Sequence, residues 1–537
     1  MSTQPDVAWQ QSRADSEPML SERIDPAMLE RLASRVTLAD PDRAGTTVHT
    51  PLTDAVIGRV PDGQPDDVIE AVRRARAAQQ DWAQRSFGDR GAVLVRFHDL
   101  VLERQDEVLD LIQLESGKAR AHAFEEVADA AIVARYYAHH SEKHLRPRRR
   151  QGALPLLTTT TEYRHPKGVV GFIAPWNYPL SMSITDALPA LMAGNGVVLK
   201  PDAMTPFTAL WAVELLTEAG LPRELFGVVS GRGTVIGTPM IENVDFICFT
   251  GSTRTGRIIG SQAGEQLIAC SLELGGKNPM IVLDDADLDA AADGAVRGCF
   301  ASAGQLCISI ERLFVQAGAF DGFVERFVER VGRIRLGAGL DWEADMGSLV
   351  SAEQFATVSK HVDDAMDKGA TVLAGGRARP DVGPHFYEPT VLAGVTEDMT
   401  VYREETFGPV VSVYGFEDID EVIGRANASP YGLNGSIWTG NTARGREIAT
   451  RLQVGTVNVN EAYAASYASV DAPMGGFKDS GLGRRHGAEG IRKYTEPQTV
   501  SVQRLMPIAA PDGLGERRYA SVMTKALGVL RRLPGVR

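Results

Sequence analysis

Four short apolar runs separated by helical segments constrain the fold of this chain more than any other feature. The runs cover residues 169–174, 196–200, 225–230 and 246–250. After the second run, Thr205-Pro206 is typical of a helix start and Gly220 of a helix end. Strands that alternate with helices predict a parallel, doubly wound α/β sheet, which binds its ligands beyond the carboxyl ends of the strands.

A second α/β unit is expected to begin near residue 276. Leu288–Phe300 and Phe320–Val331 have the periodicity of helices, and Leu313–Val315 between them is expected to be a strand. A chain of 537 residues is too long for one hydrophobic core, so at least two domains are expected.

The segments before the first sheet are less regular. Residues 65–144 have helical periodicity, with Val68, Val72, Ala75 and Trp82 on one face. Three further segments are described by composition: residues 1–50 as a polar, extended or partly disordered arm, 146–150 as a basic link and 154–165 as an exposed strand pair.

The composition excludes several classes of function. A net charge of -13 argues against nucleic-acid binding, which needs a basic surface. The four cysteines form no disulfide framework and no cluster with metal-ligand spacing, so no metal is expected. The first twenty residues contain no apolar core of a signal peptide, and no segment reaches the roughly 18 apolar residues of a membrane span. We therefore expect a cytoplasmic protein.

The last twenty residues, from about Arg518, are apolar with interspersed Lys525, Arg531 and Arg532. This pattern fits a basic amphipathic helix on a membrane surface. A helix packed on a neighbouring subunit explains it as well, and we favour that interpretation.

Three motifs supply the groups needed to oxidise an aldehyde through a thioester. Cys307, in Gly-Gln-Leu-Cys-Ile-Ser, is a thiol nucleophile, and Glu273, which opens Glu-Leu-Gly-Gly-Lys, is a carboxylate base. Asn177, in Pro-Trp-Asn-Tyr-Pro, provides a side-chain amide. The other cysteines, such as Cys248 in Phe-Ile-Cys-Phe, fit small buried hydrophobic residues.

The expected chemistry assigns a role to each group. The thiolate attacks the aldehyde, and the Asn177 amide with the backbone N–H of Cys307 holds the resulting oxyanion. Collapse of this thiohemiacetal releases a hydride to a nicotinamide cofactor and leaves a thioester. Glu273 then activates the water that hydrolyses the thioester.

Two glycine turns and one lysine are candidates for the cofactor site. Thr250-Gly251-Ser252 follows a strand and opens a helix that Ser252 can cap, so its free amides suit a pyrophosphate. Gly233 and Gly237 lie in a second loop, whose spacing departs from the dinucleotide pattern. Lys200 ends a strand and can reach a ribose hydroxyl or a 2′-phosphate.

These motifs, with others downstream, identify a resemblance to the aldehyde dehydrogenase superfamily from about residue 50 to 503. The matching segments are residues 175–179, 200–201, 249–252, 273–277, 304–307, 405–409 and 473–481. The resemblance implies a Rossmann-type cofactor domain, an α/β catalytic domain and a small β oligomerisation hairpin. It also implies a homodimer or homotetramer, in which Thr158–Glu162 and Thr499–Gln503 pair across an interface.

The resemblance carries domain boundaries and further site residues. It implies an arm at 1–50, a cofactor-binding domain at 51–147 and 167–275, a catalytic domain at 276–475, a hairpin at 148–166 and 490–503, and a tail at 504–537. The additional cofactor residues that it implies are Ala174, Pro175, Trp176, Ala203, Leu274, Gln354, Glu405 and Phe407. The substrate residues that it implies are Tyr178, Met182, Leu306, Ile308 and Ser469.

Within the family, the chain is most similar to actinobacterial NADP-dependent succinate-semialdehyde dehydrogenases. Better-known succinate-semialdehyde dehydrogenases hold the substrate carboxylate with two arginines, at whose positions this chain has Thr185 and Ala301. NAD-specific relatives carry a glutamate at the position of Ala203, where it repels a 2′-phosphate. We therefore expect NADP to be preferred and NAD to be possible.

Three alternatives stay open beside oxidation of succinate semialdehyde. The first is a broad-specificity aliphatic or aromatic aldehyde dehydrogenase. The second is a CoA-acylating enzyme, which usually lacks a glutamate at position 273. The third is a non-catalytic structural oligomer, which would be expected to have lost Cys307, Glu273 or Asn177, and all three are present.

Overall fold

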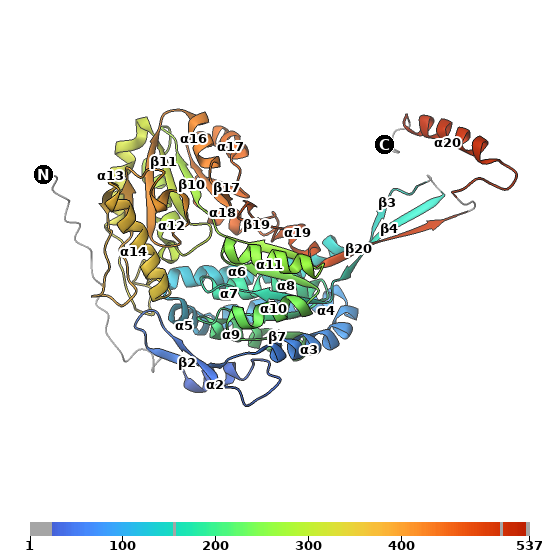
Figure 1. Cartoon of the computed structure of the whole chain (residues 1–537), viewed down its shortest axis with the longest axis horizontal. Helices are drawn as coiled ribbons and strands as arrows, with labels where there is room; N and C mark the ends of the chain where they lie inside the picture. Colours follow the sequence, from blue (N-terminus) through green and yellow to red (C-terminus); the bar gives the residue numbers. More distant parts are fainter. Residues whose placement is uncertain (1–23, 154–156, 505–507, 533–537) are drawn as a thin grey trace.

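The computed structural model describes residues 24–153, 157–504 and 508–532. Two α/β units form the body of the molecule, and a ribbon of strands projects from it (Figure 1). Each unit is built on one large sheet, so the two units predicted from the alternating strands and helices are confirmed. The chain passes from the first sheet to the second between Glu273 and Asn278.

The first sheet has six strands in the order β19-β9-β8-β5-β6-β7. Its strands are β5 (Val169–Ile173), β6 (Gly196–Lys200), β7 (Phe226–Val228), β8 (Phe246–Thr250), β9 (Ala269–Glu273) and β19 (Gly481–Leu482). The five longer strands are parallel, and every residue of β6 is buried because helices cover both faces. The short strand β19 returns late in the chain and pairs antiparallel with β9 at Glu273.

Helices before and between these strands cover the first sheet. They are α3 (Pro65–Gln84), α4 (Phe87–Glu103), α5 (Gln105–Ser116), α6 (Arg120–Leu145), α7 (Pro179–Ile184), α8 (Ala187–Met192), α9 (Pro206–Glu218), α10 (Gly233–Asn243) and α11 (Thr253–Glu265). The predicted apolar face of α3 is buried, and the Trp82 indole donates a hydrogen bond to the Leu191 carbonyl at 2.8 Å.

The start of α9 differs from the expected side-chain cap. Thr205 occupies the position before the helix but its side chain caps nothing. The buried carboxylate of Glu115 accepts the N–H groups of Phe207 and Thr208 instead, at 2.6 and 2.8 Å. A residue from α5 therefore satisfies the helix end, which no local pattern could reveal.

The second sheet has seven strands in the order β12-β13-β14-β11-β10-β16-β17. Its strands are β10 (Asn278–Val282), β11 (Ile310–Gln316), β12 (Thr371–Ala374), β13 (Thr390–Ala393), β14 (Val410–Phe416), β16 (Asn434–Trp438) and β17 (Thr456–Val459). Its helices are α12 (Leu288–Phe300), α13 (Phe320–Val331), α14 (Ala352–Asp367), α15 (Thr400–Arg403), α16 (Ile419–Asn427), α17 (Thr442–Arg451) and α18 (Ala464–Tyr467). The bounds predicted for α12 and α13 are confirmed. A two-stranded sheet of β15 (Tyr431–Gly432) and β18 (Phe477–Lys478) and the helix α19 (Gly487–Arg492) complete this half of the chain.

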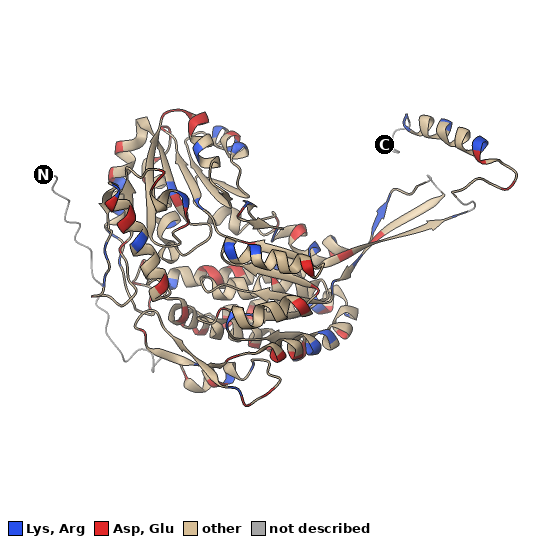
Figure 2. Cartoon of the chain, in the orientation of Figure 1, with Lys and Arg blue, Asp and Glu red and all other residues tan. Residues whose placement is uncertain are grey.

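The projecting ribbon corrects three expectations. It consists of β3 (Arg148–Arg150), β4 (Thr158–Pro166) and β20 (Thr495–Gln503), with β4 in the middle. The expected basic link is partly strand β3, whose arginines are visible in Figure 2, and the described part of 154–165 is one strand rather than a pair. Thr158–Glu162 and Thr499–Gln503 pair with each other within one chain, not across an interface, because the chain itself supplies both long strands.

The two ends of the chain also differ from a simple arm and tail. Residues 24–50, expected to be extended, contain α2 (Pro26–Ala33) and β1 (Gly45–His49), which pairs with β2 (Val56–Pro61). Leu32 and Val48 are buried in the main core, so this segment is packed onto the body. Residues 1–23 lie outside the described residues. At the other end, α20 (Glu516–Leu530) is a helix with no buried side chain, and its proposed partner stays a prediction.

No helix among the described residues is long and apolar enough to cross a membrane.

Candidate active site

The predicted catalytic residues line one cavity of about 300 Å³, formed by segments of both α/β units. Sixteen of the predicted site residues contribute to it. They are Pro175, Trp176, Asn177, Tyr178, Met182, Thr250, Gly251, Ser252, Glu273, Leu274, Leu306, Cys307, Ile308, Gln354, Glu405 and Phe407. The cavity therefore brings together predicted residues that are up to 232 positions apart, from Pro175 to Phe407.

Cys307 follows a tight loop at the end of α12. Ser302, Ala303 and Gly304 have φ angles of 51°, 54° and 69°, in the left-handed region. A Cβ at Gly304 would lie 2.0 Å from the carbonyl oxygen of Gly408, so only glycine fits there. The loop turns the chain so that Cys307 is partly exposed to the cavity, and the Asn278 amide fixes its carbonyl at 2.8 Å.

The electrostatic surroundings keep the thiol of Cys307 neutral. Burial, followed by the nearby carboxylates of Glu405 and Glu273, raises the pKa of Cys307 to about 12. Arg485 and the backbone N–H of Cys307 lower the pKa in opposition. The thiol must therefore give up its proton to a base as it attacks.

Asn177 is held in place by a buried ion pair. Lys118 donates to the Asn177 carbonyl at 2.5 Å and to the Glu126 carboxylate at 2.6 Å. The Asn177 amide donates one hydrogen bond to the Gln305 carbonyl at 3.0 Å, two residues before Cys307. Because an amide nitrogen carries two protons, the second is available to an oxyanion on the Cys307 adduct.

Glu273 ends β9 beside the cavity. Its Oε1 atom is buried and has no hydrogen-bond partner among the described residues. Burial raises the pKa of Glu273 to about 7, although Arg485 and Lys493 lower it. A carboxylate with this pKa can accept a proton near neutral pH, which is the property required of a general base.

The wall expected to bind the cofactor is formed by the end of β8 and by the loop between α15 and β14. At the end of β8, Ser252 accepts the N–H of Thr255 at 3.3 Å, so the predicted cap of α11 is confirmed. On the opposite side, the Glu405 carboxylate accepts the N–H of Gly276 at 2.7 Å. Burial and then Glu311 raise the pKa of Glu405 to about 8.

Glu311 holds the loop that carries Glu405 and Phe407. Its carboxylate pairs with Lys277 at 2.5 Å and accepts the N–H groups of Thr406 and Phe407 at 2.9 and 3.0 Å. Phe407 is in the left-handed region with φ 51°, and its ring packs edge-on against another ring of the cavity wall. The loop is therefore fixed without contact to any ligand.

Six predicted residues lie outside the lining of the cavity. They are Ala174, Lys200, Ala203, Gly233, Gly237 and Ser469. Lys200 ends β6 and is buried, with its terminal methylene 3.9 Å from a Cβ built at Gly233. Ser469 is exposed and donates to the Ala465 carbonyl. The roles of these six residues stay predictions.

Seven residues that sequence reasoning did not name line the same cavity. They are Gly275, Thr357, Thr406, Leu433, Tyr467, Met474 and Arg485. Gly275, Thr406 and Met474 lie inside motifs that were recognised, so they could have been included. Tyr467 and Arg485 come from a region between β17 and β20 whose path around the cavity depends on the tertiary structure.

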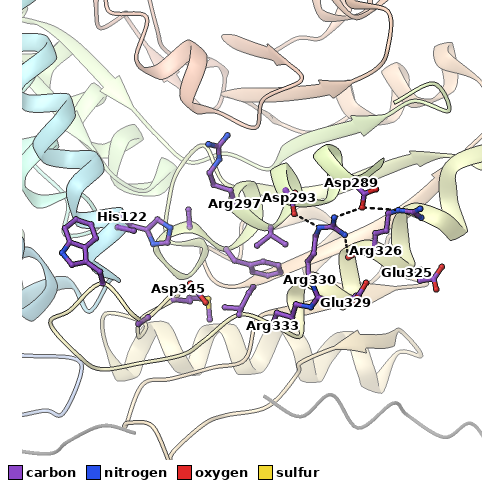
Figure 3. Close-up of a pocket in the computed structure, with 18 residues that line it drawn as sticks. His122, Asp289, Asp293, Arg297, Glu325, Arg326, Glu329, Arg330, Arg333 and Asp345 are labelled. Atoms are coloured by element: carbon purple, nitrogen blue, oxygen red, sulfur yellow. Dashed lines mark hydrogen bonds and ion pairs between the residues drawn. The ribbon is translucent and has the colours of Figure 1, made fainter. Parts of the chain in front are cut away.

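A larger groove of about 860 Å³ lies elsewhere, along α12 and α13 (Figure 3). Arg330 bridges Asp289 and Asp293 there at 2.7 and 2.5 Å, and Arg326 lies 3.5 Å from Asp289. The predicted catalytic residues do not line it, and its paired charges neutralise one another. The smaller cavity with Cys307 is therefore the candidate active site.

Comparison with known proteins agrees with the resemblance predicted from the motifs. A protein of Mycolicibacterium smegmatis, provisionally named succinate-semialdehyde dehydrogenase, NADP(+), is 52% identical over 506 residues, which cover 94% of this chain and 98% of that protein. A Mycobacterium tuberculosis protein with a similar provisional name is 48% identical over 95% of this chain and 99% of its own length. The crystal structure of an Escherichia coli NADP-dependent enzyme superposes with a TM-score of 0.82 at 35% identity and covers 86% of this chain and 95% of that one. The sequence pattern of the aldehyde dehydrogenase family matches residues 39–500, and the chain belongs to this family.

Proposed function

We propose that this protein oxidises succinate semialdehyde to succinate with NADP as the preferred oxidant. The observation that carries the aldehyde oxidation is the convergence of Cys307, Glu273 and Asn177 on one cavity. The provisional names of the relatives from Mycolicibacterium and Mycobacterium support the substrate and the cofactor.

The residues of the chain carry out the addition step as follows. The Cys307 thiol gives its proton to solvent as its sulfur forms a bond to the aldehyde carbon, which places the negative charge on the former carbonyl oxygen. The free amide proton of Asn177 and the backbone N–H of Cys307 stabilise that oxygen. One donor of this kind typically lowers the barrier by about 3 kcal/mol.

The hydrolytic step depends on Glu273. After the hydride has left, the acyl group is bound to sulfur as a thioester. With a pKa of about 7, Glu273 is partly ionised at neutral pH and can take a proton from the attacking water. The unpartnered Oε1 atom is the acceptor for that proton.

The described residues fit a nicotinamide dinucleotide, which when bound accepts the hydride of the substrate. A pyrophosphate would bind at the N-terminus of α11 (Thr253–Glu265), which Ser252 caps. A Cβ at Gly275 would lie 2.3 Å from the Glu405 carboxylate, so a larger residue at position 275 would displace that carboxylate. Glu405 and Phe407 form the side of the cavity that would hold the nicotinamide ribose.

The residues at the end of β6 support the preference for NADP. Burial lowers the pKa of Lys200, but the nearby carboxylate of Asp202 raises it in opposition. A phosphate near Lys200 would gain an ionic partner. Because position 203 is alanine, no glutamate there repels the 2′-phosphate.

We also propose a homodimer or homotetramer in a reducing, cytoplasmic compartment. Val500 and Val502 on β20 are 41% and 50% exposed, and Tyr163 on β4 is 39% exposed, so the ribbon presents apolar side chains that a second copy could cover. A free catalytic thiol is compatible with reducing conditions.

The proposal is tested with a panel of aldehydes. We expect formation of reduced cofactor with succinate semialdehyde and NADP, at a kcat/KM at least about tenfold above that of butanal and of benzaldehyde. Equal values across the panel would favour a broad-specificity enzyme. Dependence on added CoA would favour the acylating alternative.

A further inference from the structure

Arg485 is the only Lys or Arg among the described residues that line the cavity with Cys307. It lies in the segment that follows β19, and its side chain is buried, with 4% exposure. Near it, the cavity is lined by Met182, Met474 and Tyr467. A single cation in a mostly apolar wall is unusual and requires a charged or polar counterpart.

The guanidinium of Arg485 has unused hydrogen-bonding capacity. Its Nη2 atom donates to the Thr185 hydroxyl at 2.8 Å and lies 3.0 Å from Asp186. Among the hydrogen-bond acceptors of the described residues, its Nη1 atom meets only the sulfur of Met182 at 3.4 Å, which is a weak acceptor. Its Nε atom is buried and has no hydrogen-bond partner among the described residues.

The two buried cations of this region share their nearest carboxylate. Asp186 lies 3.0 Å from Arg485 and 3.2 Å from Lys493, so one carboxylate faces two cations. Asp129 also lies beside Arg485 and accepts the Tyr467 hydroxyl at 2.7 Å; burial raises its pKa, and Arg485 lowers it in opposition. His486 is kept neutral because burial and Arg485 lower its pKa to about 3. Glu273, with a pKa of about 7, is the remaining acid of this group and is needed for catalysis.

We propose that Arg485 binds the carboxylate at the far end of the substrate and so selects aldehydes that carry one. The inference rests on the proposed function and identifies how the cavity recognises succinate semialdehyde. The Nη1 protons, which meet only a weak sulfur acceptor, are the donors that a carboxylate oxygen would accept from, and an enclosed guanidinium binds it more strongly than an exposed one. Thr185 and Asp186 orient the guanidinium through its Nη2 atom.

The test compares Arg485→Met with Arg484→Met, which removes the same charge from the adjacent residue outside the cavity lining. Each variant is assayed with NADP on succinate semialdehyde and on butanal, which has the same length without the carboxylate. For Arg485→Met we expect kcat/KM on succinate semialdehyde to fall on the order of 100-fold, mainly through KM, and on butanal less than about threefold. Arg484→Met should keep the ratio of the two substrates.

The outcomes separate the inference from the proposed function. If the unmodified protein shows no preference for succinate semialdehyde over butanal, the proposed substrate is wrong. If it shows the preference and Arg485→Met retains it, or loses activity equally on both aldehydes, Arg485 is only structural and the inference is wrong. Should Arg485→Met fail to fold, Arg485→Lys keeps the charge near Asp186: retained preference with a raised KM for succinate semialdehyde alone supports the inference, and an equal loss on both substrates overturns it.

Discussion

The two walls of the cavity are built in different ways. The cofactor wall consists of strand ends and short motifs, such as Thr250–Ser252 and Glu405–Phe407, whose residues are adjacent in the sequence. The substrate wall is assembled from single residues of distant segments, including Met182, Tyr467 and Arg485. Backbone amides must approach a dinucleotide closely, which requires defined local conformations. A small aldehyde is recognised by side chains alone, which any neighbouring segment can supply.

Cys307 lies where the walls meet, so its removal should have the largest effect. Cys307→Ala is expected to reduce turnover by at least about 10,000-fold, because no other group can form the thioester. The melting temperature and the binding of NADP, followed by fluorescence, should be nearly unchanged. Cys270→Ala, at a half-buried cysteine outside the cavity lining, is the matched control and should keep activity. Substantial turnover by Cys307→Ala would disprove the assignment of the nucleophile.

The cofactor wall should depend on the buried pair of Glu311 and Lys277. Glu311→Gln leaves the lysine without an anionic partner and weakens the support of the Thr406 and Phe407 amides. We expect a loss of roughly 3–5 kcal/mol in the free energy of unfolding. Denaturant titration measures this loss. Glu404→Gln, at an exposed residue next to Glu405 in the supported loop, provides the control.

The same variant tests whether the cofactor wall and the substrate wall act independently. In Glu311→Gln, KM for NADP should rise while the ratio of kcat/KM for succinate semialdehyde over butanal stays constant. A change in that ratio would mean that the two walls are not independent.

Glu273 serves the hydrolytic step, so its substitution should have an intermediate effect. Glu273→Gln cannot accept a proton and is expected to slow steady-state turnover by roughly 100-fold. Stopped-flow measurement should show a burst of reduced NADP followed by slow release of acid. If the burst is lost as well, Glu273 also deprotonates Cys307.

The pH dependence gives an independent check on Glu273. A base acts in its deprotonated form, so with a pKa of about 7 the kcat of the unmodified protein should rise as the pH increases through 7. In Glu273→Gln this rise should be absent. A profile that is identical in both proteins would assign the titration to another group.

The smallest expected effect concerns the end of β6. Ala203→Glu places a carboxylate near the position expected for the 2′-phosphate and should shift the ratio of kcat/KM for NADP over NAD by about tenfold toward NAD. Ala203→Gln adds the same volume without charge and should shift it less. A preference of tenfold or more for NAD in the unmodified protein would contradict the proposed cofactor.

The sequence predicted the strands and helices of the body well because their apolar patterns are local. β6, β8, α12 and α13 have the predicted bounds. The predictions failed where contacts with a distant strand or with the core decide the structure. Residues 148–150 form a strand only because β4 lies beside them, and residues 24–50 are ordered because the core accepts Leu32 and Val48.

What the sequence determined by itself was the chemistry and the two α/β units. The nucleophile, the base and the oxyanion amide lie in compact motifs, and the alternation of strands and helices fixes a parallel sheet whatever its surroundings. The tertiary structure decided the properties that depend on enclosure: the pKa of about 7 at Glu273, the support of Asn177 by Lys118, and the place of Arg485 in the cavity wall. Burial and proximity between segments distant in the sequence set these properties, and no local pattern records them.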